Sequence, residues 1–186
     1  MRAWALLVLA LAACKAASAG PYAPESEARR DPVRAQELSA RAADLIATDV
    51  GEAERVLREA LGADLFFGPA HNNLGVVYLK QKKLYEAAGE FEWARKLMPG
   101  HPDPRMNLAL TLEQAGQTDE AIATYKTALE VWPGHLGSIQ ALAKLCVVSN
   151  RSDPELAGWL DQIAVQGETE PWREWARREN SRSHYQ

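Results

Sequence analysis

The sequence predicts an all-α protein, a right-handed helical solenoid of about three and a half repeats with capping helices at its C-terminal end. The first observation is a regular period, at which similar side chains return along the middle of the chain. It relates Ala53, Ala87 and Ala121, then Leu57, Phe91 and Tyr125, then Ala60, Ala94 and Ala128, and finally Pro99 and Pro133. A fixed period of about 34 residues is typical of stacked helix pairs. The second observation is that apolar residues recur at helical spacing from about Val33 onward.

Composition is consistent with one domain of ordinary size. The chain has 186 residues, of which 47% are hydrophobic, enough to form a substantial core. The formal net charge of −4 and the absence of a long basic run argue against binding to nucleic acid, so we expect no nucleic-acid partner.

The first residues have the pattern of an export signal. Arg2 precedes an unbroken apolar run from Trp4 to Ala13. This run is shorter than the roughly 20 residues that a membrane-spanning helix needs, and it ends in small residues. We therefore interpret residues 1–13 as a secretory signal peptide.

The end of this run, Leu11-Ala12-Ala13-Cys14, resembles the cleavage box of bacterial lipoproteins. The resemblance implies that Cys14 is lipidated with acyl chains such as palmitate, becomes the mature N-terminus and anchors the protein to a membrane of the bacterial cell envelope. The protein would then face the periplasm, and Lys15 in place of an aspartate mildly favours the outer membrane. An ordinary cleaved signal with a nearby cysteine and an uncleaved anchor are the alternatives.

After Cys14, small residues, three prolines and mixed charges predict a flexible tether over 14–33. Asp31-Pro32 is a helix start signal, because aspartate caps a helix and proline suits its first turn. Apolar spacing then predicts repeats over 34–150, with capping helices and a tail over 151–186. The expected helices are 33–48, 51–62, 68–81, 84–97, 102–115, 118–131, 136–149, 153–165 and about 170–179.

The two central units resemble the tetratricopeptide repeat (TPR), and the resemblance covers about 34–150. The second unit matches its pattern at Leu74, Gly75, Tyr78, Ala87, Phe91, Ala94 and Pro99. The third matches at Leu108, Ala109, Leu112, Gly116, Ala121, Tyr125, Ala128 and Pro133. His71 and Arg105 stand where the pattern has tryptophan. We expect Gly75 to face Ala87, Phe91 to fill the volume between units, and Gly100 and Gly134 to form C-terminal turns.

Proteins of this family typically bind ligands on a concave face lined by the first helix of each pair. Here the matching positions, expected to be exposed, are Asn72, Asn73, Val76, Lys80, Met106, Asn107, Leu110, Glu113, Gln140 and Lys144. The resemblance implies that they hold a protein or an extended peptide. They depart from the chaperone-binding subgroup, in which lysines and asparagines clamp a terminal carboxylate. Hydrogen bonding of each asparagine within its repeat is the alternative.

Nothing in the sequence indicates catalysis, a metal site or a cofactor. His101 and His135 are explained by the repeat, and no histidines or cysteines have metal-binding spacing. Cys146 is expected to be a buried, inert thiol. The predicted function is thus a non-catalytic scaffold, with assembly of a secretion, pilus or outer-membrane machine as the leading context. An adaptor for peptidoglycan-processing enzymes and an envelope enzyme with an unrecognised site are the alternatives.

Overall fold

A computed structural model describes residues 30–183, and these residues form helices and no strands. The helices are α1 (Pro32–Leu45), α2 (Val50–Ala63), α3 (Gly68–Lys80), α4 (Leu84–Leu97), α5 (Asp103–Gln114), α6 (Thr118–Val131), α7 (Leu136–Val148), α8 (Leu156–Gln166) and α9 (Glu170–Ser183). The predicted signal peptide, Cys14 and the tether as far as residue 29 lie outside the described residues.

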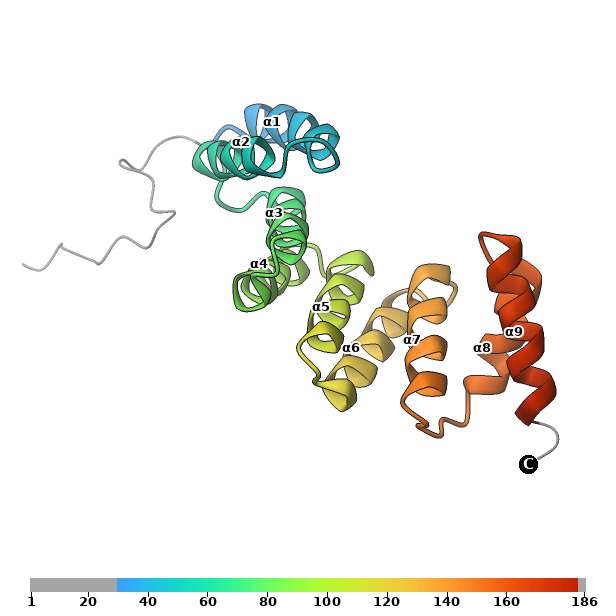
Figure 1. Ribbon diagram of the computed structural model, residues 1–186. Coiled ribbons are helices and arrows are strands. Elements are labelled where there is room, and N and C mark those ends of the chain that lie inside the picture. The colour runs from blue at the N-terminus through green and yellow to red at the C-terminus, as the bar shows by residue number, and fades with distance from the viewer. Residues whose placement is uncertain (1–29, 184–186) are drawn as a thin grey trace, which may run out of the picture.

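The helices pack as successive antiparallel pairs along a curved row, with α1 and α2 at one end and α9 at the other (Figure 1). The predicted all-α solenoid is thus confirmed. The first helix begins at Pro32 with Asp31 as its cap, as the start signal predicted: the Asp31 carboxylate accepts a hydrogen bond from the Arg34 amide at 3.0 Å. The segment predicted as tether, 14–33, therefore extends slightly too far. By contrast, α8 begins later than expected, because the Asp153 carboxylate accepts a hydrogen bond from the Glu155 amide and so forms a turn before the helix.

The turn inside each of three helix pairs follows the period of the sequence. Lys82, Gly116 and Asn150 occupy the same position in successive units, and their φ angles are 62°, 77° and 53°. This left-handed conformation ends a helix by letting later amides bond to carbonyls of its last turn. Gly100 and Gly134 lie in the turns that follow α4 and α6, as expected, but without this left-handed conformation.

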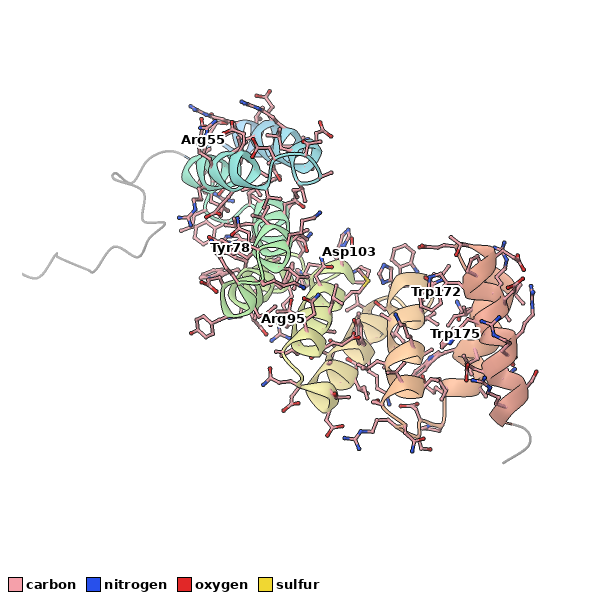
Figure 2. The ribbon with its side chains drawn as sticks, in the orientation of Figure 1. Arg55, Tyr78, Arg95, Asp103, Trp172 and Trp175 are labelled. Atoms are coloured by element: carbon pink, nitrogen blue, oxygen red, sulfur yellow. The ribbon has the colours of Figure 1, made fainter. Side chains whose placement is uncertain are left out.

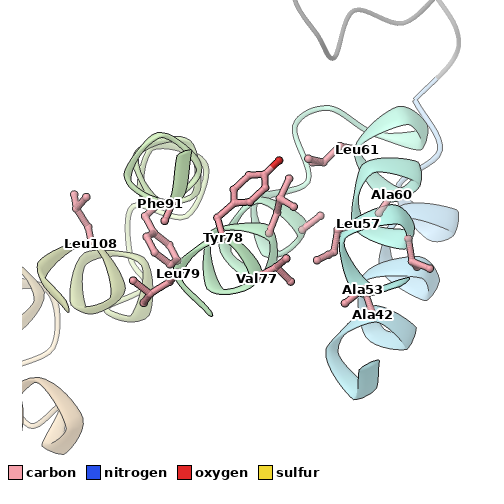
Figure 3. Packing of buried hydrophobic residues seen from close by; sticks show 14 residues of the cluster. Ala42, Ala53, Leu57, Ala60, Leu61, Val77, Tyr78, Leu79, Phe91 and Leu108 are labelled. Carbon is pink, nitrogen blue, oxygen red and sulfur yellow. The ribbon is translucent and has the colours of Figure 1, made fainter. Parts of the chain in front are cut away.

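The core is built from the residues that carry the period. The small residues Ala53, Ala87, Ala121, Ala60, Ala94 and Ala128 are all fully buried. Two clusters of buried side chains divide at α5, where Leu108 belongs to the first and Ala109 to the second. Figure 3 shows the first cluster, in which Phe91 lies beside Leu79 with Leu108 of the next unit close by. Because each unit buries its neighbour's apolar face, contacts between neighbouring units contribute to the stability of the stack.

Gly75 allows the two helices of the second unit to approach each other, but not in the way expected. A Cβ atom at this position would lie 2.6 Å from the ring of Phe91. The partner of Gly75 is therefore Phe91 rather than Ala87, and Phe91 fills space inside its own unit as well as toward the next one.

Replacing Gly75 by alanine should lower the free energy of unfolding by about 1–3 kcal/mol, because the buried Phe91 ring must move. Gly89 is the matched control: it is exposed on α4, and an added Cβ would meet nothing within 4 Å. Gly89→Ala should raise the free energy of unfolding by about 0.5–1 kcal/mol through helix propensity. Urea denaturation measures both changes. If both substitutions changed the free energy of unfolding in the same direction, this packing would be contradicted.

The C-terminal end of the stack is covered by tryptophans. Trp159 of α8 is 6% exposed, and the half-buried Trp172 and Trp175 of α9 pack against the second cluster. Figure 2 shows Trp172 and Trp175 on the side of α9 that faces α7. Arginines on the outer side of α9 form ion pairs with Glu170, Glu174 and Glu179 of the same helix. The last helix thus presents charge to solvent and apolar surface to the stack.

Candidate functional site

The first helices of the pairs, α1, α3, α5 and α7, lie next to one another, and we call their shared exposed side the first-helix face. Two side-chain hydrogen bonds join these helices across units. The Asn73 amide donates to Ser39 Oγ of α1 at 3.2 Å, and the Asn107 amide donates to Asn72 Oδ1 of α3 at 3.0 Å. Both bonds run between repeats rather than within one. An asparagine amide has two donor hydrogens and an acceptor oxygen, so each keeps capacity for a ligand.

Apolar side chains accompany these amides. Val76 on α3 and Met106 and Leu110 on α5 are half-buried. Leu38 of α1, which was not predicted, is also half-buried against the first cluster and extends the set to a third helix. Lys80 at the end of α3 is exposed. The structure therefore brings most of the predicted residues onto one face.

Two of the ten predicted positions do not fit this face. Gln140 is 4% exposed, so the expectation that it is exposed was wrong, and its Nε2 has no hydrogen-bond partner among residues 30–183. Glu113 accepts a hydrogen bond from the Tyr125 hydroxyl at 3.2 Å. Burial, with the nearby carboxylate, raises the pKa of Tyr125, which keeps the hydroxyl protonated as the donor.

Lys144 on α7 is exposed, but it lies two units away from Lys80. The lysines therefore form no cluster around the asparagines. This arrangement favours ligands held by amide bonds and apolar contacts over ligands held by charge.

A buried polar pair in the second unit was not predicted. His71 Nδ1 lies 2.7 Å from Glu90 Oε2, and His71 Nε2 lies 2.8 Å from the carbonyl oxygen of Leu65. His71 is 1% and Glu90 7% exposed, and Trp93 stacks on the imidazole with ring centroids 5.7 Å apart. The pair joins α3 to α4 and to the preceding turn. Its role is structural, since the stacked tryptophan and the helix pair enclose it.

Ser138, His135 and Asp103 resemble a hydrolase triad in composition. Ser138 Oγ lies 2.8 Å from His135 Nδ1, and His135 Nε2 lies 3.2 Å from Asp103 Oδ1. However, Ser138 is 0% exposed, so no substrate can reach its hydroxyl. The three residues instead join the starts of α5 and α7, and thereby stabilise the contact between the third and fourth units.

The thiol of Cys146 is enclosed as well. Cys146 is a free thiol, 1% exposed, and burial raises its pKa, so it stays in the unreactive protonated form. Within residues 30–183, no three histidine, cysteine or acidic side chains are arranged to hold a metal ion. In the same range no helix has the length and apolarity needed to cross a membrane.

Asp64 organises the turn between the first and second units. Its carboxylate is 1% exposed and accepts hydrogen bonds from Arg30 at 2.8 and 3.0 Å and from the Phe66 amide at 3.0 Å. The hydrogen bond from Arg30 lowers the pKa of Asp64, and the Phe66 amide lowers it further. The charged carboxylate therefore stabilises the fold.

Asp64→Asn should cost roughly 1–3 kcal/mol of unfolding free energy at neutral pH, since a charge-assisted hydrogen bond is lost. Because the folded-state pKa is lowered, this stabilisation is complete above the pKa of the unfolded chain, near 3.9, and disappears as the pH falls. Urea denaturation of wild type and variant at neutral pH and below about pH 3 should show the two stabilities converging in acid. If the free energies of unfolding of wild type and variant differed by the same amount at all pH values, the ion pair of Asp64 with Arg30 would not account for the difference.

Comparison with known families agrees with this geometry. Two family models, both described as tetratricopeptide repeat, match residues 43–102 and 78–146, and together they span more than half of the chain. The chain carries tetratricopeptide repeats. Such repeats are generally non-catalytic scaffolds for protein interaction, since a stack of units offers an extended surface rather than an enclosed pocket. No curated protein matches the chain.

Several solved structures have the same fold. The first TPR of Spaghetti (RPAP3), bound to the HSP90 peptide SRMEEVD, is 18% identical with a TM-score of 0.60, and the match covers 65% of this chain and 97% of that one. MamA of Desulfovibrio magneticus is 18% identical with a TM-score of 0.58, over 80% and 76% of the two chains. A mutant O-GlcNAc transferase of Thermobaculum terrenum is 24% identical with a TM-score of 0.65; it matches over 81% of this chain but only 27% of the enzyme, its TPR region.

Proposed function

We propose that this TPR protein is a lipid-anchored, non-catalytic scaffold of the bacterial cell envelope, which holds a peptide segment of a partner protein on its first-helix face. The observation that carries the proposal is the joining of three successive first helices by amides, with half-buried apolar side chains between them. A peptide lying across this face would meet an apolar side chain on each of α1, α3 and α5 and an asparagine amide on α3 and α5.

The geometry suits an extended peptide. Packed helices are about 8–10 Å apart, and an extended chain advances about 6.6 Å for every two residues, so side chains on one edge can reach successive helices. Leu38, Val76 and Leu110 would receive apolar side chains, while Asn73 and Asn107 would bond to the peptide backbone. The solved peptide complex of an RPAP3 repeat domain supports a peptide as the class of ligand. The separation of Lys80 from Lys144 favours an apolar segment over an acidic terminus.

The test places charge on the face without disturbing its hydrogen bonds. The wild-type chain should capture its envelope partners. The double variant Val76→Glu/Leu110→Glu should not, because charged carboxylates replace the apolar contacts. Val165→Glu is the matched control, since Val165 is 77% exposed on α8, away from the first helices. A photocrosslinking residue at position 76 should label the same partner, and one at position 165 should not. Equal labelling from both positions would refute the proposed face.

Anchoring is tested separately. Cells fed labelled palmitate should transfer it to the wild-type chain and not to Cys14→Ser, and the variant should leave the membrane fraction. Equal labelling of the two chains would exclude the anchor while leaving the binding face intact. Within the envelope, we propose assembly of a secretion, pilus or outer-membrane machine as the context, and slightly favour the outer membrane.

A further inference from the structure

One edge of the second unit exposes large apolar side chains that the first-helix face does not use. Phe66 in the turn between α2 and α3 is 50% exposed, and Trp93 of α4 is 48% exposed. Pro69, in the first turn of α3, is exposed as well. We call Phe66, Pro69 and Trp93, together with the basic residues Arg30 and Lys96, the aromatic edge.

Ring, cation and hydrogen-bond contacts link the parts of the aromatic edge. The Arg30 guanidinium lies 5.2 Å from the centre of the Phe66 ring, and Lys96 Nζ lies 5.9 Å from the centre of the Trp93 ring. Trp93 rests on His71, whose Nε2 bonds to the carbonyl of the residue before Phe66. Each aromatic ring is thus held against the fold on one side, open to solvent on the other and accompanied by a cation.

Aromatic rings beside basic side chains have the chemistry of a membrane–water boundary. A tryptophan places its ring among the upper acyl chains and its N–H among the polar groups, and lysine or arginine reaches the phosphates along an apolar stem. Trp132, 55% exposed, lacks this setting: its ring packs on His135, which pairs with the carboxylate of Asp103. The surface around Trp132 therefore suits contact with water rather than with lipid.

The aromatic edge also lies where the chain enters the repeats. Arg30 belongs to it, and only the segment 15–29 separates Arg30 from Cys14. At no more than about 3.6 Å per residue, that segment holds the edge within roughly 55 Å of a lipid on Cys14. Tethering over such a distance corresponds to an effective concentration of the order of millimolar, so weak contacts are enough to keep the edge docked.

Docking at this edge would leave the partner-binding face open. His71 and Trp93 connect α3 to α4, whereas Asn73 connects α3 to α1. The two surfaces therefore use different sides of α3. We propose that the aromatic edge is a second membrane contact: Phe66 and Trp93 enter the interfacial layer of the bilayer that carries the lipid on Cys14, and Lys96 faces its phosphates. This inference rests on the proposed lipid anchor.

Quenching by brominated lipids tests the contact directly. Every sample carries Trp4→Phe, which removes the tryptophan of the signal segment. The full chain is coupled through Cys14 to a maleimide lipid in phosphatidylcholine vesicles with brominated acyl chains. Cys146 is buried and does not compete for coupling. Tryptophan fluorescence should be quenched in the parent. Most of this quenching should disappear in Trp93→Phe and remain in Trp132→Phe, the matched control of similar exposure.

A second variant excludes a general change in folding. Phe66→Ser keeps Trp93 but removes the other exposed ring of the aromatic edge, so quenching should fall while the helical circular dichroism is unchanged. An unquenched parent, or equal quenching in the parent and Trp93→Phe, would overturn the proposal and leave the edge open to a protein partner. Because coupling to Cys14 is chemical, these results do not depend on acylation in cells. Palmitate labelling of Cys14→Ser decides the anchor independently.

Discussion

Phe91→Ala should lower the free energy of unfolding by about 3–5 kcal/mol, the cost of leaving a cavity where a buried phenylalanine stood. Phe91 is 0% exposed and packs on Gly75 of its own unit. It also belongs to the cluster that includes Leu108 of the next unit. The ring therefore stabilises both the closure of one helix pair and its contact with the following pair. Urea denaturation followed by circular dichroism measures the change.

Tyr85→Ala is the control for this prediction. Tyr85 lies on the same helix but is 90% exposed, so its replacement should change the free energy of unfolding by less than about 0.5 kcal/mol. In a stack of repeats the loss at Phe91 should also separate the transitions of neighbouring units, because coupling passes through their interface. A loss below about 1 kcal/mol would show that the cavity closes readily and that Phe91 does not hold the helix pair.

Glu90→Ala should cost about 3 kcal/mol, because removing one member of a buried polar pair leaves the other without its partner in the interior. His71 Nδ1 would lose its 2.7 Å contact with the carboxylate. Glu90→Gln, which keeps an amide near the imidazole, should cost less. The matched control is Glu59→Ala, since the pair of Glu59 with Arg34 is exposed and should contribute no more than about 1 kcal/mol.

Thermal and urea denaturation of the three variants would rank these effects. Equal losses in Glu90→Ala and Glu59→Ala would mean that water reaches the His71 pair. A further readout is the fluorescence of Trp93, which stacks on His71 and should change in Glu90→Ala but not in Glu59→Ala.

The fold was largely predictable because its units repeat. Ala87 and Ala121 had to be small for helices to pack, and the repeat period located each helix within a few residues. The start of α1 at Asp31-Pro32 was predicted, because a capping residue followed by proline is visible in the sequence. The start of α8 was not, because the side chain of Asp153 forms a turn before it. Capping depends on one hydrogen bond, which apolar periodicity does not report.

The candidate site was predictable only in outline. The period correctly brought Asn73 and Asn107 onto first helices, but it did not show that their amides bond to Ser39 and Asn72 of the preceding unit. It also presented Gln140 as exposed, although the packed structure buries it. The binding roles of these residues remain predictions.

The sequence by itself therefore determined the class of fold, the number and order of the helices and the positions that must be small or apolar. These follow from a pattern in which each residue's burial is set by its place in the repeat. Only the tertiary structure decided which polar groups meet, such as His71 with Glu90 and Asp64 with Arg30, and which surfaces stay open, such as the edge at Phe66 and Trp93. Such contacts depend on distances of a few ångströms between residues far apart in the chain, and no period encodes them.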